Sequence, residues 1–191
     1  FFLSGQEFED VHVKFEDWQT VKKTLPFGQA PVLEVTQDGK KFQMAQSNTI
    51  ERYLSNKYNL NGSNELETAR IDMICEHVID LHGSLSSIYR KPDNDERKSE
   101  LDKALNTSIP DGLKMIEKLI ESNKIENSDS DFLVGNSPSR ADLKLVAFYD
   151  WRDEILGHVP HLQAHYQKIR SLPRLKEFYD KTENQKVTIL F

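Results

Sequence analysis

The sequence contains a single cysteine and no cluster of basic residues. Cys75 alone excludes an internal disulfide and a metal site built from several cysteines. A chain without disulfides is compatible with the reducing cytosol. The formal net charge is −6, and lysines and arginines alternate with acids, so no basic stripe of the kind that binds nucleic acid emerges. We therefore expect no nucleic-acid partner.

Long hydrophobic runs are also absent. No apolar run reaches the roughly 20 residues that a membrane-spanning helix needs. Phe1-Phe2-Leu3 is apolar, but it ends at Ser4-Gly5 and is too short for a signal peptide. We expect no membrane insertion and a cytoplasmic location. Because the first residue is Phe rather than Met, we also expect the sequence to begin downstream of the natural start of translation.

The remaining composition is that of an ordinary globular protein. The 191 residues are 37% hydrophobic and 29% charged, which suffices for one large domain or two small ones. The residue pattern changes near position 60, from short mixed segments to long helical ones. We expect an α/β domain over residues 1–58, a polar linker over 59–65 and an all-helical domain over 66–191.

Four elements are predicted in the first domain. Residues 8–15 alternate apolar and polar side chains, which is typical of a half-buried strand. Residues 17–24 predict a short helix. Asp38-Gly39 lies between two short apolar segments, 31–35 and 41–45, and this dipeptide is a strong hairpin signal. A helix is expected after the hairpin, and its apolar residues recur at helical spacing behind Ser47, a good N-cap: Ile50, Tyr53, Leu54 and Tyr58.

The second domain is predicted to be helical throughout. Two apolar stripes at helical spacing are Ile71, Ile74, Cys75, Val78, His82 and Leu85, then Leu101, Leu105, Ile109, Leu113, Ile116 and Ile120. Pro110 predicts a kink in the second of these helices. A further helix is expected to begin at Ser139, whose spacing to Asp142 resembles a capping box. Two short helices follow, from about His161 and from Pro173.

The run from Leu25 to Leu33 is the most informative stretch for function. Gly28 followed by a proline-led strand exposes unpaired backbone, which can pair with an extended peptide. A cis bond before Pro31 would present the N–H and C=O of Ala30 to a ligand. The alternative is a plain turn into a strand, and the residue types alone favour that interpretation.

Gln46-Ser47 forms a second candidate site. Ser47 at a helix N-terminus offers a hydroxyl and a backbone N–H, where the helix dipole favours an anion such as a carboxylate. A plain N-cap also explains Ser47. It does not explain Gln46, which directly follows a hairpin that brings it near Ala30.

Three further residues have an ordinary and a functional interpretation. Trp18 and Lys22 lie four residues apart, so an indole N–H and an ammonium on one helical face could bind a second carboxylate. A solvated lysine and a partly buried tryptophan are the default. Asp80 lies on the polar face of its helix, where a solvent-facing acid is the ordinary explanation.

Taken in order along the chain, these motifs resemble those of cytosolic glutathione transferases. They are Asp17-Trp18, Lys22, Leu-Pro-Phe-Gly-Gln-Ala-Pro-Val-Leu at 25–33, Gln46-Ser47 with Ile50 and Arg52-Tyr53-Leu54, and the Ser139–Asp142 cap. Trp18 and the Leu-Pro-Phe-Gly run most resemble the sigma class, which includes glutathione-dependent prostaglandin D synthases and is related to lens crystallins.

The resemblance implies a fold and a glutathione site. The first domain would be thioredoxin-like, with its first strand and most of its first helix ahead of Phe1, and the second an all-α bundle. Ala30, with Pro31 in the cis form, would pair with the cysteinyl backbone of glutathione. The other glutathione-binding residues would be Gln46 and Ser47 at the γ-glutamyl end, Trp18, Lys22 and Gln29 at the glycine carboxylate, Gly28 in the loop, and Asp80 from the partner subunit. The family often has Lys where Gln29 stands.

The resemblance also implies an enzyme. A tyrosine hydroxyl would stabilise the glutathione thiolate for attack on a small hydrophobic electrophile, with isomerisation or reduction of lipid-derived substrates as further reactions. That tyrosine would precede Phe1, and no metal is implied. The electrophile would lie near Ser87, Ile88, Tyr89 and Phe191. The protein would be a homodimer, with Phe27 inserted into the partner.

Two other classes of protein remain open. One is a catalytically silent glutathione-binding or structural protein on the same fold, because a fold does not imply an activity. The other is an interaction module like the transferase-like domain of a translation elongation factor subunit. The sequence ends soon after the expected helices, so we expect no appended domain, which disfavours the module.

Overall fold

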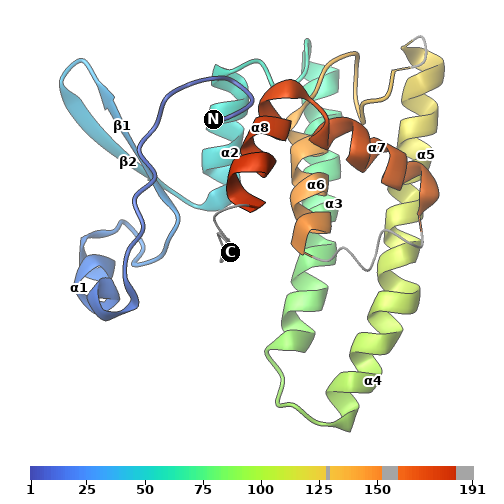
Figure 1. Ribbon diagram of the computed structural model, residues 1–191, viewed down its shortest axis with the longest axis horizontal. Coiled ribbons are helices and arrows are strands. Elements are labelled where there is room, and N and C mark those ends of the chain that lie inside the picture. The colour runs from blue at the N-terminus through green and yellow to red at the C-terminus, as the bar shows by residue number, and fades with distance from the viewer. Residues whose placement is uncertain (128–129, 152–158, 184–191) are drawn as a thin grey trace. The chain divides into compact units, whose positions relative to one another are not determined.

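The computed structural model describes residues 1–127, 130–151 and 159–183 (Figure 1). Its contacts divide the chain into two units, Phe1–Tyr58 and Asn59–Phe191. None of the helices in the described ranges is both long and apolar enough to cross a membrane.

The first unit is built around a hairpin and one helix. Its elements are η1 Phe15–Asp17, α1 Trp18–Val21, η2 Lys22–Thr24, β1 Val32–Gln37, β2 Lys40–Ala45 and α2 Ser47–Lys57. β1 and β2 pair antiparallel, with Gln37 opposite Lys40. The turn between them places both Asp38 and Gly39 at positive φ, +52° and +72°, as a two-residue hairpin loop of the primed type requires. The hairpin and the helix behind it are confirmed.

The strand predicted over residues 8–15 is wrong. The sheet of the described chain has two strands, β1 and β2, and residues 8–14 form no regular element. The side chains of Val11 and Phe15 are 70% and 94% exposed. Alternation predicts which side chains share a face, but a strand also needs a neighbour to supply its hydrogen bonds. No described segment provides that neighbour here.

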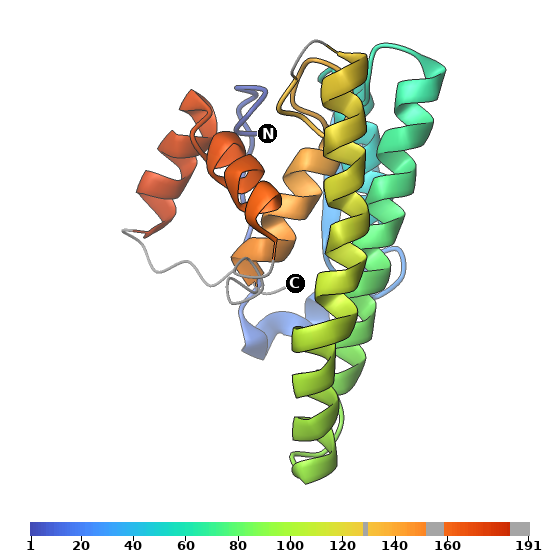
Figure 2. The same ribbon diagram turned by 90° about the vertical axis from the view of Figure 1, so that its right-hand side faces the viewer.

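The second unit is helical. Its elements are α3 Glu65–Tyr89, α4 Asp95–Lys103, η3 Ala104–Ser108, α5 Ile109–Glu126, α6 Arg140–Trp151, α7 Pro160–Arg170 and α8 Pro173–Glu183. Figure 2 shows α4, η3 and α5 as one continuous rod beside α3. The start of α3 is capped in both directions. Asn64 Oδ1 accepts the Glu67 N–H at 3.0 Å, and Glu67 Oε2 accepts the Ser63 N–H at 2.7 Å.

The hydrophobic core lies in the second unit. Both predicted stripes contribute to it, except that His82, Leu101 and Leu105 are only half-buried. Its buried members on α3 and α5 are Ile71, Ile74, Cys75, Val78, Leu81, Leu85, Ile109, Leu113, Ile116 and Ile120. In residues 1–58, all of which are described, Ser55 is the one buried residue.

α3 and α5 approach closely at Gly112. A Cβ atom placed on this glycine would lie 2.6 Å from Leu81 Cδ2, which is closer than packed carbon atoms allow. His77 Nε2 also lies 3.1 Å from the Gly112 carbonyl oxygen. Glycine is therefore needed here for helix packing rather than for backbone conformation.

A π turn directly precedes Pro110, where the sequence predicts a kink. Pro110 lies in the first turn of α5, where its missing N–H is tolerated. Ahead of it, the Ile109 N–H bonds to the Ala104 carbonyl five residues back. The wide turn keeps Ala104 and Ile109, both buried, on the same side of the rod.

Candidate functional site

A cavity of about 210 Å³ lies in the first unit, beside the start of the hairpin. Three segments form it: the loop before β1, the end of β2 and the first residues of α2. Its lining residues are Phe27, Gln29, Ala30, Pro31, Ala45, Gln46 and Ser47. The structure therefore brings together five residues predicted to bind glutathione, and these come from two separate motifs.

The hairpin register explains why the two motifs meet. Val32, the first residue of β1, pairs with Ala45, the last residue of β2. Pro31 and Gln46 follow outward from this pair, so the loop and the helix start lie at the same end of the sheet. The Ala30–Pro31 peptide is cis, as expected. Neither backbone group of Ala30 forms a hydrogen bond within the described chain, so both are open to a ligand.

The loop before the cavity turns at Gly28. This glycine has φ +62°, and its N–H bonds to the Leu25 carbonyl at 3.1 Å. The Lys22 side chain lies against it, because a Cβ on Gly28 would be 3.4 Å from both Cγ and Cε of Lys22. Lys22 thus reaches the loop but does not line the cavity. Trp18, one turn earlier, is half-buried and also lies outside the lining.

The start of α2 differs by one residue from the prediction. Gln46, and not Ser47, is the N-cap, and Ser47 is the first helical residue. Gln46 has φ +73° and ψ 111°, a conformation that non-glycine residues rarely adopt. Its side chain makes no capping bond. The exposed Ser47 therefore presents its hydroxyl and one of the unpaired N–H groups of the helix N-terminus.

The two remaining predicted site residues are Phe27 and Asp80. Phe27 lines the cavity, yet 66% of its surface is exposed, which is unusual for a large apolar side chain. Asp80 is exposed on α3 in the second unit and has no hydrogen bond or ion pair within the described residues.

The predicted electrophile region is only partly described. Ser87 is exposed at the end of α3, and Ile88 and Tyr89 are half-buried. Phe191 lies outside the described residues.

The cavity is lined by uncharged residues. None of its lining residues is a tyrosine, a histidine or a lysine. Within the described ranges, no group of three His, Cys, Asp or Glu side chains could hold a metal ion. The lining offers backbone groups, two side-chain amides and a hydroxyl, which are groups that can pair with a peptide-like ligand.

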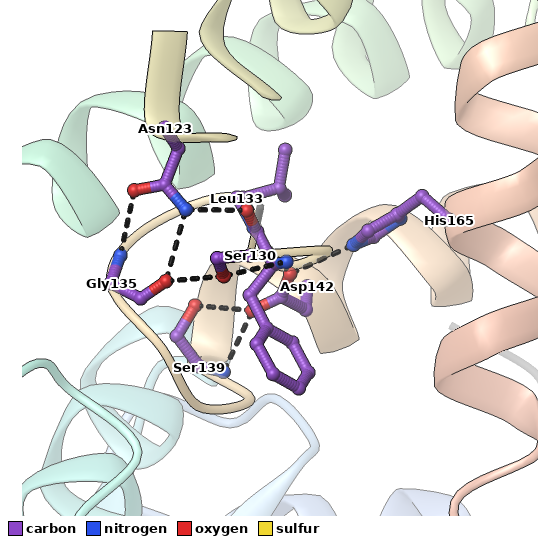
Figure 3. A network of polar contacts seen from close by, with 8 residues as sticks. Asn123, Ser130, Leu133, Gly135, Ser139, Asp142 and His165 are labelled. Carbon is purple, nitrogen blue, oxygen red and sulfur yellow. Dashed lines mark hydrogen bonds and ion pairs between the residues drawn. The ribbon is translucent and has the colours of Figure 1, made fainter. Parts of the chain in front are cut away.

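A second polar centre, in the second unit, was only partly predicted. Asp142 accepts the Ser139 N–H and hydroxyl, each at 2.7 Å, through Oδ2. Its Oδ1 accepts the Leu133 N–H at 2.9 Å and lies 2.8 Å from His165 Nε2 (Figure 3). Asp142 and His165 are both buried. The predicted link between Ser139 and the acid is confirmed, while His165, which lies on α7, carries no local signal.

Asn123 extends this centre along the loop that leads into α6. Its Nδ2 donates to the carbonyls of Phe132 and Gly135, each at 2.9 Å, and its Oδ1 accepts the Gly135 N–H at 2.9 Å. Ser130 Oγ also donates to the Gly135 carbonyl, at 2.6 Å. The centre is buried and its hydrogen bonds join residues of the loop to α5, α6 and α7, so it orders the loop. A polar Asn in the apolar stripe of α5 was the one available sequence signal.

Known proteins match this chain over most of its length. Residues 79–182 match the family model of the glutathione S-transferase C-terminal domain. The chain is 34% identical over 194 residues to glutathione S-transferase 2 of Onchocerca volvulus, covering 98% of this chain and 88% of that protein. It is 33% identical over 183 residues to glutathione S-transferase 2 of Manduca sexta, covering 92% of this chain and 85% of that protein.

Solved structures of the same family have the same fold as this chain. The Pi-class glutathione S-transferase of Onchocerca volvulus superposes with a TM-score of 0.81 at 31% identity, covering 100% of this chain and 88% of that one. Prostaglandin synthase D of Nilaparvata lugens superposes with a TM-score of 0.80 at 32% identity, covering 94% of this chain and 88% of that one.

The fold and the cavity together define a class of protein. A small thioredoxin-like α/β unit with a cavity at one end of its sheet precedes an all-helical unit, which is the glutathione S-transferase fold. The chain belongs to the glutathione S-transferase family of enzymes. The family inferred from the motifs is therefore confirmed.

Proposed function

We propose that this chain is a glutathione transferase of the sigma-like class that conjugates the glutathione thiolate to small hydrophobic electrophiles. The observation that carries the proposal is the cavity, where the unpaired backbone of Ala30 lies beside Gln46 and Ser47. An extended tripeptide can pair with that backbone as an added strand does. The γ-glutamyl carboxylate is then held at the N-terminus of α2 by Ser47.

The other end of glutathione is assigned to a cationic group. Lys22, the first residue of η2, packs against Gly28 of the loop that also carries Gln29. Its ammonium suits the glycine carboxylate, and Trp18 and Gln29 add neutral donors. In the proposed dimer, Asp80 of the partner subunit meets the charged amino group of the γ-glutamyl end, and Phe27 inserts into the partner.

The proposal includes a cytoplasmic location and a role in detoxification. Cys75, the single cysteine of the sequence, is buried and can form no internal disulfide, which is compatible with a reducing compartment. Isomerisation or reduction of lipid-derived substrates is an extension of the same thiolate chemistry. The similarity to prostaglandin synthase D of Nilaparvata lugens supports that extension.

Titration calorimetry with glutathione tests the assigned site. Changing Ser47 to Ala is expected to weaken binding by about 1–3 kcal/mol, because a carboxylate loses a hydrogen-bond donor. Ser137→Ala, at an exposed loop serine in the second unit, is the matched control and is expected to leave the affinity unchanged. Equal affinities of the Ser47 variant and the unmodified chain would remove Ser47 from the site.

A glutathione-binding protein without catalysis is the second candidate. The cavity fits it as well, because recognition of glutathione by Ala30, Gln46 and Ser47 needs no reaction. A conjugation assay with a chromogenic aryl halide separates the two candidates. Turnover above the uncatalysed rate identifies an enzyme, whereas glutathione binding without turnover identifies the binding protein.

A further inference from the structure

The dipeptide Asp-Gly occurs twice in the sequence, at Asp38–Gly39 and at Asp111–Gly112. The first copy forms the tip of the β1–β2 hairpin, and the second lies near the start of α5. Glycine has no side chain to shield its backbone nitrogen, so this nitrogen can attack the carboxyl group of the aspartate before it. The two copies therefore share their chemistry and differ only in their surroundings.

The hairpin copy is open to this attack. Asp38 and Gly39 are both exposed, and a Cβ atom placed on Gly39 would meet nothing within 4 Å. Within the described residues, the Asp38 carboxylate has no hydrogen bond or ion pair, and the Gly39 N–H has no acceptor. Rotation of the peptide between them disturbs only the turn, because the paired strands end at Gln37 and Lys40.

The helical copy is protected. Gly112 is buried, and a Cβ atom placed on it would lie 2.6 Å from Leu81 Cδ2. The Asp111 carboxylate is 2.9 Å from Lys114 Nζ. Bringing the Gly112 nitrogen to that carboxylate would rotate a peptide inside the helix and move a closely packed residue. The same dipeptide is thus held in place in α5 and free to react in the hairpin turn.

The reaction is an isomerisation that needs only water. In mildly acidic solution the carboxyl group of Asp38 is protonated, and its hydroxyl leaves as water, with the amide proton, when the Gly39 nitrogen bonds to the carboxyl carbon. The product is a five-membered succinimide. Water then adds to one of its two carbonyl groups. Addition at the main-chain carbonyl breaks the original peptide bond, so that the chain continues through the side chain and Cα carries a free carboxylate.

The isoaspartyl product does not fit the hairpin. It adds one methylene group to the main chain between Gln37 and Lys40, and a two-residue primed turn matches the twist of its strands only at its normal length. The sheet of the described chain has two strands, so each takes its ladder hydrogen bonds from the other. The far end of the hairpin pairs Val32 with Ala45, and this pair brings the two sides of the cavity together.

We propose that Asp38 is a site of spontaneous isomerisation to isoaspartate, and that this modification loosens the hairpin and weakens glutathione binding. The isomerisation and the loosening stand on the exposed turn and its strands. The weakening of binding rests on the proposed function, because it takes the cavity as the glutathione site.

The isomerisation is tested by ageing the chain at mildly acidic pH in water enriched in the heavy oxygen isotope. Each passage through the succinimide leaves one heavy oxygen atom in the aspartyl residue. Peptide mapping by mass spectrometry locates this label, and cleavage by endoproteinase Asp-N distinguishes aspartate from isoaspartate. We expect about tenfold more label at Asp38 than at Asp111, because the helix must open before it reacts. Equal labelling at the two positions, or none at Asp38, would overturn the proposal.

The effect on binding is tested with the isoaspartyl fraction, separated from the aged chain by hydrophobic-interaction chromatography. Calorimetry is expected to show glutathione binding about three- to tenfold weaker than in the fresh chain, because fewer molecules hold the cavity in its binding shape. Asp38→Gly is the matched control, since Gly-Gly is also a turn dipeptide and has no carboxyl group. Aged and fresh Asp38→Gly are expected to bind alike. An isoaspartyl fraction with the affinity of the fresh chain would refute the weakening.

Hydrogen exchange separates this inference from the proposed function. The amides of residues 32–37 and 40–45 are expected to exchange about tenfold faster in the isoaspartyl fraction than in the fresh chain. Unchanged exchange rates would refute the loosening of the hairpin. A fresh chain that does not bind glutathione would refute the proposed function, and the isomerisation and the loosening are then decided by the label and the exchange rates.

Discussion

The Asp142 carboxylate holds Ser139 twice, because its Oδ2 accepts both the backbone N–H and the hydroxyl of that residue at 2.7 Å. Its other oxygen meets Leu133 and His165, so one side chain joins the loop before α6 to α7. The side chain of Asp142 is fully buried. Removing it would leave several buried donors without an acceptor.

We therefore expect Asp142→Ala to destabilise the protein strongly, by roughly 3–5 kcal/mol, because buried polar groups lose their partner. Ser139→Ala removes only the hydroxyl and is expected to cost about 1 kcal/mol. Urea unfolding followed by circular dichroism measures both. Glu121→Gln, an exposed acid on α5, is the control. Equal losses for Asp142→Ala and the control would show that the buried network contributes little.

Two helical glycines form a matched pair for a packing test. Gly112→Ala is expected to destabilise by about 1–3 kcal/mol, since the new methyl group overlaps Leu81. At Gly83 a Cβ meets nothing within 4 Å. Gly83→Ala is therefore expected to stabilise α3 by about 0.5–1 kcal/mol through its helix propensity. Thermal unfolding of both variants checks the pair, and a shift of the same sign in both would contradict the packing argument.

His82 predicts a pH dependence of stability. Its folded pKa is depressed below the ordinary value of 6.5, by burial first and by Lys144 and Arg90 next. Between the folded and unfolded pKa values the unfolded chain binds more protons, so stability is fully present above pH 6.5 and falls as the pH decreases through the folded pKa.

His82→Gln should flatten that decrease. Urea midpoints at pH 7.5 and 5.5 are compared with those of His12→Gln, whose histidine is exposed. The His82 variant is expected to lose less stability on acidification than the control. An identical loss of stability in both variants would show that His82 does not cause the pH dependence.

Phe27 predicts the oligomeric state. In the proposed dimer this exposed ring is buried in the partner, so Phe27→Ser is expected to shift the protein toward monomer in sedimentation velocity. Phe15, which is 94% exposed, supplies the control Phe15→Ser. The control should sediment like the unmodified chain. A monomeric unmodified chain, or a dimer that survives Phe27→Ser, would rule out this contact.

Features of the fold that depend on neighbours in sequence were predictable. Asp38-Gly39 specifies its hairpin turn locally, and the link between Ser139 and Asp142 spans three residues. The strand predicted over residues 8–15 is wrong because a strand needs a hydrogen-bonding partner distant in sequence, and the alternation of its own side chains does not reveal one. His165 was missed for the same reason, since it meets Asp142 from a helix 23 residues further on.

In the candidate site, too, features set by neighbours in sequence were predictable and features set by distant residues were not. Ala30 and Gln46 were identified from loop and turn chemistry, but the cavity they share arises from the register that pairs Val32 with Ala45. The N-cap was assigned one residue too late, because serine is the commoner cap and the left-handed backbone of Gln46 leaves no mark in the sequence.

The π turn makes the length of the α4–α5 rod adjustable at one place. Ala104 and Ile109 are five positions apart, and the wide turn returns both to the core. Deleting one residue between them would leave four positions, the ordinary spacing of an α-helix, and would keep both on the same side. The same deletion within α5 would rotate all that follows by about 100° and turn Leu113 or Ile116 toward solvent. Deletion of one residue is therefore expected to preserve the core packing within Leu105–Ser108 and to disrupt it one turn later, within α5.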